Sequence, residues 1–352
     1  MKIWGKYLIV LLALCLLVLG GCQNQTEETT EQLPEGVIKD QLGREVILPE
    51  QIDKVAATHI YGGKMLFAMG QKNKVAYQMQ LGADLEALAQ IDEYYGSLPT
   101  ISSTPNGADS PESLSALGVD LVFFDVSEVD EAEAYENAGI TTVAVSGETF
   151  DEVYETARLM GQIFDNESQA EELIDFIENK RNLLEGRTEG LKDDEKPVVL
   201  VTGSGGVYTA ATSSMFQHQM IETAGGINAG ADLTGRWARI SAEDIIAMDP
   251  DYIILGSSFG VDTVESVLDD PALQTVTAVK NQDVYIFPSN LGWWDFPLPQ
   301  SVLGIIWTGT IIHPELFSDI DILAEANEVY QTIYGYTYTE LGGVITDANR
   351  NQ

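Results

Sequence analysis

The sequence predicts an α/β fold with two Rossmann-like lobes that are joined by a single long backbone helix and hold a ligand cleft between them. Short apolar strands alternate with helical stretches, a pattern typical of mostly parallel sheets. A fourteen-residue pattern occurs twice, and one long amphipathic helix lies between its two copies. The folded part of roughly 315 residues is long enough to bury two cores.

The chain begins with a predicted secretory signal peptide at residues 1–21, in which two lysines precede an apolar run at residues 7–19. The leader ends in Leu-Gly-Gly before Cys22, and this ending resembles the processing site of bacterial lipoproteins. We therefore expect cleavage before Cys22 and lipidation of its sulfur, which would anchor the protein to a membrane. An uncleaved membrane helix with an incidental cysteine is the alternative. Because Cys15 leaves with the leader, we expect no internal disulfide.

Residues 22–35 are polar, acidic and nearly free of apolar side chains, so we expect them to form a flexible tether. The whole chain has a formal net charge of −37. Such a surface repels nucleic acid and anionic lipid head groups, which excludes both as partners. For the acidity itself, we favour adaptation to a saline or alkaline medium over selection for a cationic ligand.

The strands are expected in two groups. The first lobe, residues 36–165, has apolar runs that predict strands at residues 54–58, 74–77, 120–124 and 140–145, with a helix at residues 63–69. The second lobe, residues 191–345, has runs that predict strands at residues 197–202, 251–255 and 283–287.

Residues 166–190, between the lobes, predict the long backbone helix. Asn166 and Gln169 form a plausible capping box, apolar residues recur on one face, and Gly186 is placed to end the helix. A helix of about 20 residues is roughly 30 Å long, the size of a small domain. We expect such a strut to permit only modest opening between the lobes.

The repeated pattern is S-x-E-x-Φ-x-A-Φ-x-x-D-x-Φ-Φ, where Φ is apolar. It covers residues 110–123 and again residues 241–254 without a gap. Each copy predicts an N-capped helix, a turn and a buried strand. Each copy also places one glutamate, Glu112 or Glu243, at the equivalent point of its lobe.

The chain resembles the helical-backbone (class III) substrate-binding proteins of ABC importers for ferric siderophores, haem and cobalamin. The resemblance covers roughly residues 36–340. It is carried by the two repeats and by the segments at residues 40–49, 66–70, 224–229, 284–288 and 330–336.

This resemblance implies an extracytoplasmic binding lipoprotein on the outer face of the cytoplasmic membrane, without enzymatic activity or cofactor. It would capture an iron complex, a ferric siderophore or haem, and deliver it to the permease and ATPase of an ABC importer. A monomer is expected. A corrinoid-binding or oxyanion-binding protein of the same fold, for example for molybdate, is one alternative. A secreted hydrolase that uses Ser204, His218 and an aspartate is another.

The resemblance also implies a role for the repeated glutamates. In the family, one glutamate on each lobe docks onto arginines of the permease, and Glu112 and Glu243 match those positions. Carboxylates on separate lobes would fix the orientation of docking. The alternative is that each is a first-turn helix acid favoured by the helix dipole.

Ligand contacts are expected in loops beyond the carboxyl ends of the strands. The candidates from the residues in those loops are His59, Tyr61, Tyr77, Gln78, Tyr208, Phe259, Trp293 and Trp294. The aromatic rings suit a large ring-bearing ligand, although a packing role fits each of them equally well. Arg236 and Arg239, which flank Trp237, could hold an anionic ligand or pair with neighbouring acids.

Direct binding of a free metal ion is not expected, because the chain has only three histidines, His59, His218 and His313. Related zinc and manganese binders usually carry several histidines with carboxylates. His59 or His218 could still complete the coordination of iron in a bound complex.

Overall fold

The computed structural model describes residues 33–101, 110–203, 205–256 and 262–346. Residues from Gly36 onward belong to one compact unit. The predicted signal peptide and Cys22 lie outside the described residues, as does Phe259. Across the described ranges, no helix is both long and apolar enough to cross a membrane.

The first lobe is built on three parallel strands in the order β3-β4-β5. They are β3 (Val55–Ala57), β4 (Leu121–Asp125) and β5 (Thr141–Val145). The helices of this lobe are α2 (Ile60–Ala68), α3 (Ala83–Ile91), α4 (Glu93–Ser97), α5 (Pro111–Leu117), α6 (Val129–Asn137) and α7 (Phe150–Ile163). Every residue of the central strand β4 is buried, as its apolar run predicts.

The prediction of a strand at residues 74–77 is wrong. The only ladder contact of this segment is a single parallel bridge between Val55 and Val75. The chain then turns away because the Gln78 backbone N–H donates to the Pro99 carbonyl, at 2.9 Å, instead of to the sheet.

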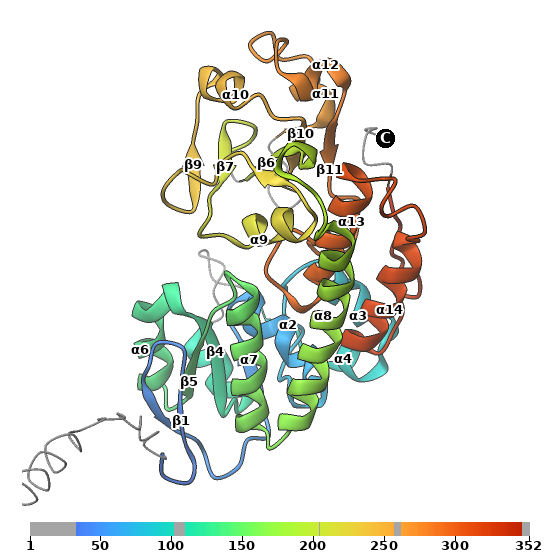
Figure 1. Ribbon diagram of the computed structural model, residues 1–352. Helices are drawn as coiled ribbons and strands as arrows, with labels where there is room; N and C mark the ends of the chain where they lie inside the picture. Colours follow the sequence, from blue (N-terminus) through green and yellow to red (C-terminus); the bar gives the residue numbers. More distant parts are fainter. Residues whose placement is uncertain (1–32, 102–109, 204, 257–261, 347–352) are drawn as a thin grey trace, which may run out of the picture. The chain divides into compact units, whose positions relative to one another are not determined.

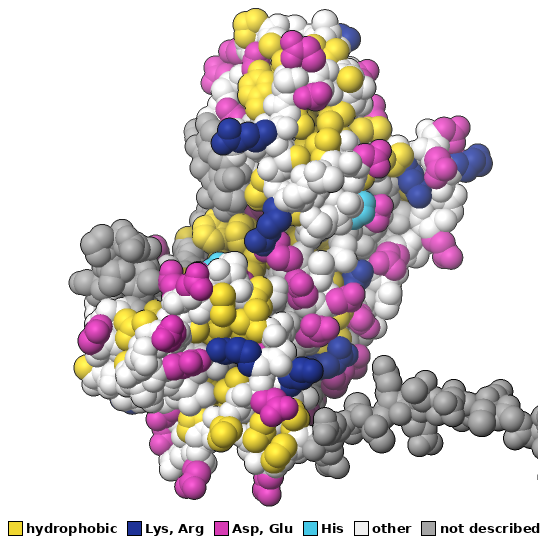
Figure 2. All heavy atoms as spheres, turned by 90° about the vertical axis from the view of Figure 1, so that its left-hand side faces the viewer, with side chains coloured by type: hydrophobic (Ala, Val, Ile, Leu, Met, Phe, Trp, Pro, Cys, Tyr) yellow, Lys and Arg dark blue, Asp and Glu magenta, His cyan; other side chains and the backbone are white. Residues whose placement is uncertain are grey.

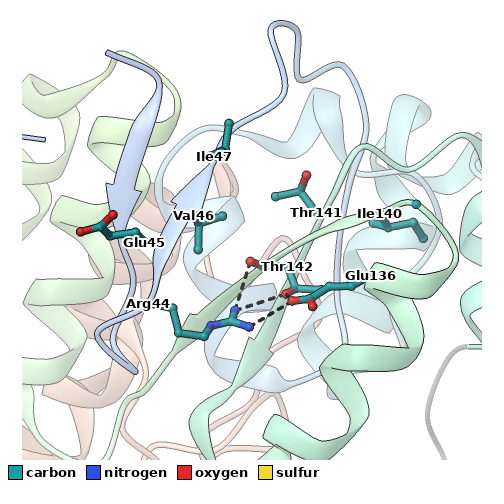
Figure 3. A pocket seen from close by; sticks show the side chains of 9 residues that line it. Arg44, Glu45, Val46, Ile47, Glu136, Ile140, Thr141 and Thr142 are labelled. Atoms are coloured by element: carbon teal, nitrogen blue, oxygen red, sulfur yellow. Dashed lines mark hydrogen bonds and ion pairs between the residues drawn. The ribbon is translucent and has the colours of Figure 1, made fainter. Parts of the chain in front are cut away.

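An antiparallel hairpin of β1 (Val37–Lys39) and β2 (Glu45–Ile47) lies against the edge of this sheet. The Arg44 guanidinium donates to Asp40 (2.8 Å) within the hairpin, and also to Glu136 (3.1 Å) and Thr142 (3.2 Å). Figure 3 shows the contacts of Arg44 with Glu136 and Thr142 at one side of a shallow surface hollow of about 490 Å³. Because Arg44 is occupied by these partners, we assign it the structural role of fixing the hairpin to β5.

The second lobe has four parallel strands in the order β11-β10-β6-β8. They are β6 (Val198–Thr202), β8 (Ile227–Asn228), β10 (Tyr252–Leu255) and β11 (Val284–Ile286). A separate two-stranded antiparallel sheet pairs β7 (Thr209–Ala211) with β9 (Trp237–Arg239). The helices are α9 (Phe216–Thr223), α10 (Ala242–Met248), α11 (Val264–Leu268) and α12 (Thr277–Asn281). Both lobes therefore have the predicted parallel α/β build.

The repeated pattern folds twice into the predicted unit. Ser110 caps α5 by accepting from the Ser113 N–H (3.1 Å), and Ser241 caps α10 by accepting from the Asp244 N–H (3.2 Å). Each helix ends in a left-handed residue and leads into an interior strand, β4 or β10.

The repeated aspartates bind the strand next to their own. The Asp120 carboxylate accepts from the Lys54 N–H at the start of β3, and the Asp251 carboxylate accepts from the Val198 N–H of β6, both at 2.8 Å. The repeated aspartate therefore has a structural role, because it holds the start of the neighbouring strand. The repeated glutamate makes no such contact among the described residues.

Helix α8 (Glu167–Thr188) runs alongside α7 and continues beside α9 and α13 (Figure 1). Its predicted apolar face is buried. The predicted capping box does not form, since the Asn166 side chain makes no capping hydrogen bond. The helix also passes Gly186, because Arg187 binds Asp319 (2.8 Å) and the Leu316 carbonyl (2.7 Å) in the last turn.

The C-terminal helices are α13 (Val302–Ile312) and α14 (Ile322–Tyr334). Helix α14 packs on α2 of the first lobe. Tyr334 donates to Asp84 (2.8 Å) and Tyr336 donates to Asp92 (3.1 Å). The C-terminal segment therefore also packs on the first lobe, a contact that the sequence prediction did not include.

Candidate functional site between the lobes

The carboxyl ends of the first sheet bring three side chains to one edge. His59 follows β3, Asp125 ends β4 and Glu148 follows β5. Because parallel strands end at the same edge, these residues converge as loop residues of open α/β sheets do. Tyr61, in the first turn of α2, donates its hydroxyl to Glu148 Oε1 at 2.7 Å.

The second lobe adds an arginine to this edge. Arg236, just before β9, forms an ion pair with the same Glu148 oxygen. The Arg236 side chain is 55% exposed and that of Glu148 is 22% exposed. Two residues further along the first-lobe loop, the Phe150 N–H donates to Gln219 of α9 at 3.1 Å. The loop after β5 is thus one place where the two lobes meet through polar contacts.

Aromatic rings line the same region. The rings of His59 and Tyr61 are 4.5 Å apart, and Phe296 lies 6.2 Å from Tyr61 and 5.5 Å from Trp293. The ring of Trp237, the neighbour of Arg236, lies against Gly203 at the end of β6. The polar cluster is therefore bordered by aromatic surface from both lobes.

Gly147 allows the loop after β5 to approach this cluster closely. A Cβ at this position would lie 2.9 Å from the Tyr61 ring and 3.0 Å from the Pro297 carbonyl oxygen. The first distance is too short for a Cβ atom, and the second is tighter than an ordinary contact. Glycine therefore lets the backbone pass between Tyr61 and the segment around Pro297, which positions Glu148.

Burial sets the protonation states in the cluster. Burial lowers the pKa of His59, the nearby Asp125 opposes this shift and Arg236 adds to it. Burial raises the pKa of Tyr61 above its usual value, and Asp125 raises it further. At neutral pH the site therefore offers a neutral imidazole, a phenolic hydroxyl and a guanidinium. His59 Nδ1 is buried and has no hydrogen-bond partner among the described residues.

The structure places three predicted ligand residues elsewhere. Tyr77 is only 2% exposed, and its hydroxyl donates to the Ala57 carbonyl at 3.3 Å. The Gln78 amide donates to the Gly96 and Leu98 carbonyls, both at 2.9 Å. Trp294 is completely buried in the core. Hydrogen bonds to backbone carbonyls hold the first two side chains and core packing holds the third, so none of the three lines the cluster.

Tyr208 and Arg239 of the second lobe also lie outside the cluster. The Tyr208 hydroxyl donates to Asp270 at 2.6 Å, and this hydrogen bond raises its pKa to about 12. Arg239 is exposed at the end of β9, and no ion pair joins it to another described residue. The predicted residues that do converge are His59, Tyr61 and Arg236, and Trp293 is joined to them through the ring of Phe296.

The sequence prediction missed Glu148 and Phe296. Glu148 follows the predicted strand at residues 140–145, so the rule that selected His59 could have selected it. Its pairing with Arg236 had no signal in the sequence, because the two residues come from different lobes.

Acidic side chains are scattered over the face that Figure 2 shows and are more frequent there than lysine and arginine. Glu112 and Glu243 are both exposed at the second position of their helices. Among the described residues, no group of three or more histidine, cysteine, aspartate or glutamate side chains could hold a metal ion. His218 lies 3.4 Å from Glu222, and His313 bonds to the Gly225 carbonyl at 3.0 Å.

Known proteins agree with this two-lobed architecture. The chain is similar to the molybdate-binding protein MolA of Haemophilus influenzae, with 23% identity over 87% of this chain and 93% of MolA. It is also similar to the Fe(3+)-citrate-binding protein YfmC of Bacillus subtilis, with 22% identity over 78% of this chain and 86% of YfmC. A periplasmic solute binding protein from Veillonella parvula has the same fold, with a TM-score of 0.71, 24% identity, and coverage of 88% of this chain and 96% of that one.

The family model described as "Periplasmic binding protein" matches residues 92–291, more than half of the chain. Members of this family are extracytoplasmic, bind small ligands and work with the membrane components of ABC transporters; they are not enzymes. With its two parallel α/β lobes and long connecting helix, the chain belongs to the periplasmic binding protein family and is a class III substrate-binding protein of an ABC transporter.

Proposed function

We propose that this protein captures an anionic iron complex, such as a ferric siderophore or haem, between its two lobes and delivers it to the permease of an ABC importer. The observation that carries this proposal is the meeting of Arg236, Tyr61 and His59 at one point. The chain has a net charge of −37, so cationic side chains are rare, and an arginine at this point favours an anionic ligand.

The chemistry of the site fits such a ligand. A guanidinium and a phenolic hydroxyl bind carboxylate, catecholate or other oxygen anions through charge-assisted hydrogen bonds. The rings of Trp293, Phe296 and Trp237 offer apolar contact to the organic part of a chelate. A ligand with both an anionic edge and a ring surface would use all of these groups.

A molybdate-like oxyanion is the second candidate ligand. The similarity to MolA over most of both chains favours it, and a small anion needs only the polar part of the site. Competition between molybdate and a ferric chelate would show whether both use the same donors.

Tryptophan fluorescence tests the proposal, because Trp293 contacts Phe296 beside Tyr61 and Trp237 follows Arg236 in the chain. The purified protein is titrated with ferric citrate, a ferric catecholate siderophore, haem, cobalamin and molybdate. Saturable quenching by an iron complex would support the first candidate, and an effect confined to molybdate would support the second. An absence of response to every ligand would contradict both.

The membrane anchor is a further part of the proposal. Cys22 is the proposed lipidation site, and residues 22–35 would tether the folded unit to the outer face of the cytoplasmic membrane. Replacement of Cys22 by serine should release the protein from the membrane fraction. Retention of the variant would contradict lipid anchoring through this residue.

A further inference from the structure

Glu148 of the first lobe contacts both Tyr61 of its own lobe and Arg236 of the second lobe. Its Oε1 atom accepts the Tyr61 hydroxyl at 2.7 Å and also pairs with Arg236. A carboxylate oxygen therefore already occupies the point on which a phenolic hydroxyl and a guanidinium converge. That arrangement is what an oxygen anion from outside the protein would require.

The backbone around Glu148 is held more firmly than its side chain. The Glu148 N–H donates to Glu152 Oε2 at 2.6 Å, and Thr149 and Glu152 form a capping box at the start of α7. By contrast, both Glu148 and Arg236 have partly exposed side chains. Because more than half of the Arg236 side chain is exposed, water screens this ion pair, and another anion can replace the carboxylate by a rotation of the Glu148 side chain.

Resting on the proposed function, we propose that Glu148 is a specificity-determining residue: its carboxylate fills the anion subsite between the lobes until the ligand's own anionic group displaces it. The donors remain in place, because Tyr61 is buried and Arg236 keeps a counter-ion throughout. The ligand then takes over both contacts, and beside them His59 Nδ1 has no hydrogen-bond partner among the residues that the structure describes.

This arrangement makes the sign of the ligand's charge testable. For an anionic ligand, Glu148 is a competitor, so removal of its charge strengthens binding. For a ligand with a cationic group at this point, Glu148 would be a contact, so the same change would weaken binding.

The experiment compares Glu148→Gln with the unchanged protein, using ferric citrate, haem and molybdate as probes. We expect Glu148→Gln to bind an anionic probe about fivefold more tightly, the effect of losing one partly exposed charge pair. Asp151→Asn is the matched control, because Asp151 is an exposed acid three residues away in the first turn of α7. That control should leave the affinity unchanged.

Arg236→Gln completes a double-mutant cycle. It should weaken binding, and Glu148→Gln should add little in its presence, because Glu148 then has no arginine to occupy. Unchanged or weaker binding by Glu148→Gln alone would overturn the assignment of Glu148 and leave the proposed function standing. Failure of every probe to bind any of these proteins would instead overturn the anionic ligand class, and with it the subsite.

Discussion

The properties of His59 come from the residues around it. Burial makes the charged imidazole unfavourable, and Arg236 from the other lobe adds to the effect, while Asp125 opposes it. The same residue in a solvated loop would keep an ordinary pKa of about 6.5. The folded protein therefore holds His59 neutral at a pH where the unfolded chain starts to bind a proton.

This shift predicts a pH dependence of stability. Between the lowered pKa and about 6.5, the unfolded state binds more protons at residue 59 than the folded state, so the free energy of unfolding decreases as the pH falls through that window. His59→Gln should remove this contribution. Urea unfolding of both proteins between about pH 7 and pH 5 should show a smaller loss for the variant. If the free energy of unfolding changed with pH in the same way for both proteins, a lowered pKa of His59 would be contradicted.

At the scale of single elements, Gly186 lowers the stability of the helix α8 in which it lies. Gly186 lies inside α8, and a Cβ there would meet no atom within 4 Å. Glycine in a helix interior is less stable than alanine by up to about 1 kcal/mol. The helix continues past Gly186 because the contacts of Arg187 outweigh this local cost.

Gly186→Ala should therefore stabilise the protein by about 0.5–1 kcal/mol. Gly118→Ala is the matched comparison, because Gly118 ends α5 with a φ of 71° that alanine adopts with strain. Thermal or urea unfolding should show opposite signs for the two variants. A loss of stability in Gly186→Ala would mean that the glycine at this position has a role in packing.

The contact between α14 and the first lobe depends on two similar clusters. Lys64, Asp84 and Tyr334 form the first, and Lys72, Asp92 and Tyr336 form the second. The side chains of Lys64 and Asp84 are completely buried, whereas that of Lys72 is 28% exposed. The two clusters have the same composition in different environments.

Asp84→Asn should cost about 3–5 kcal/mol of unfolding free energy, because it leaves the buried Lys64 without its counter-charge. Asp92→Asn should cost less, about 1 kcal/mol, since water can reach Lys72. Urea unfolding measures both costs. Equal costs for the two variants would contradict the role of burial.

At the scale of the whole molecule, the repeated unit gives each lobe one exposed glutamate at the same point. The repeated serines, aspartates and apolar residues have structural roles in caps, strand contacts and cores. Glu112 and Glu243 have no comparable contact within the described residues, which favours the proposed docking to a permease over a purely structural role.

Charge reversal tests this docking. Glu112→Lys or Glu243→Lys should reduce ligand uptake by cells while the ligand affinity of the purified protein stays the same. Glu265→Lys is the matched control, because Glu265 is also an exposed acid at the second position of a capped helix, α11, outside the repeat. A comparable loss of uptake in the control would mean that the loss comes from reversing any first-turn helix acid, and would contradict docking through Glu112 and Glu243.

The sequence by itself determined the local units of this protein. Strand-forming apolar runs, the capping serines of the repeat and the apolar face of α8 depend on residues close together in the chain, and their patterns could be read directly. The loops after parallel strands also indicated His59 and Tyr61, because the edge at which such strands end follows from topology alone.

Tertiary structure decided which of the candidate residues meet. Glu148 pairs with Arg236 across 88 positions of the chain, Trp294 is buried instead of lining the site, and α14 packs back onto the first lobe. These outcomes depend on contacts between segments distant in sequence, and local propensity carries no information about such contacts. For this reason the sequence predicted most strands of the two parallel sheets, while only the folded chain showed which side chains come together beside them.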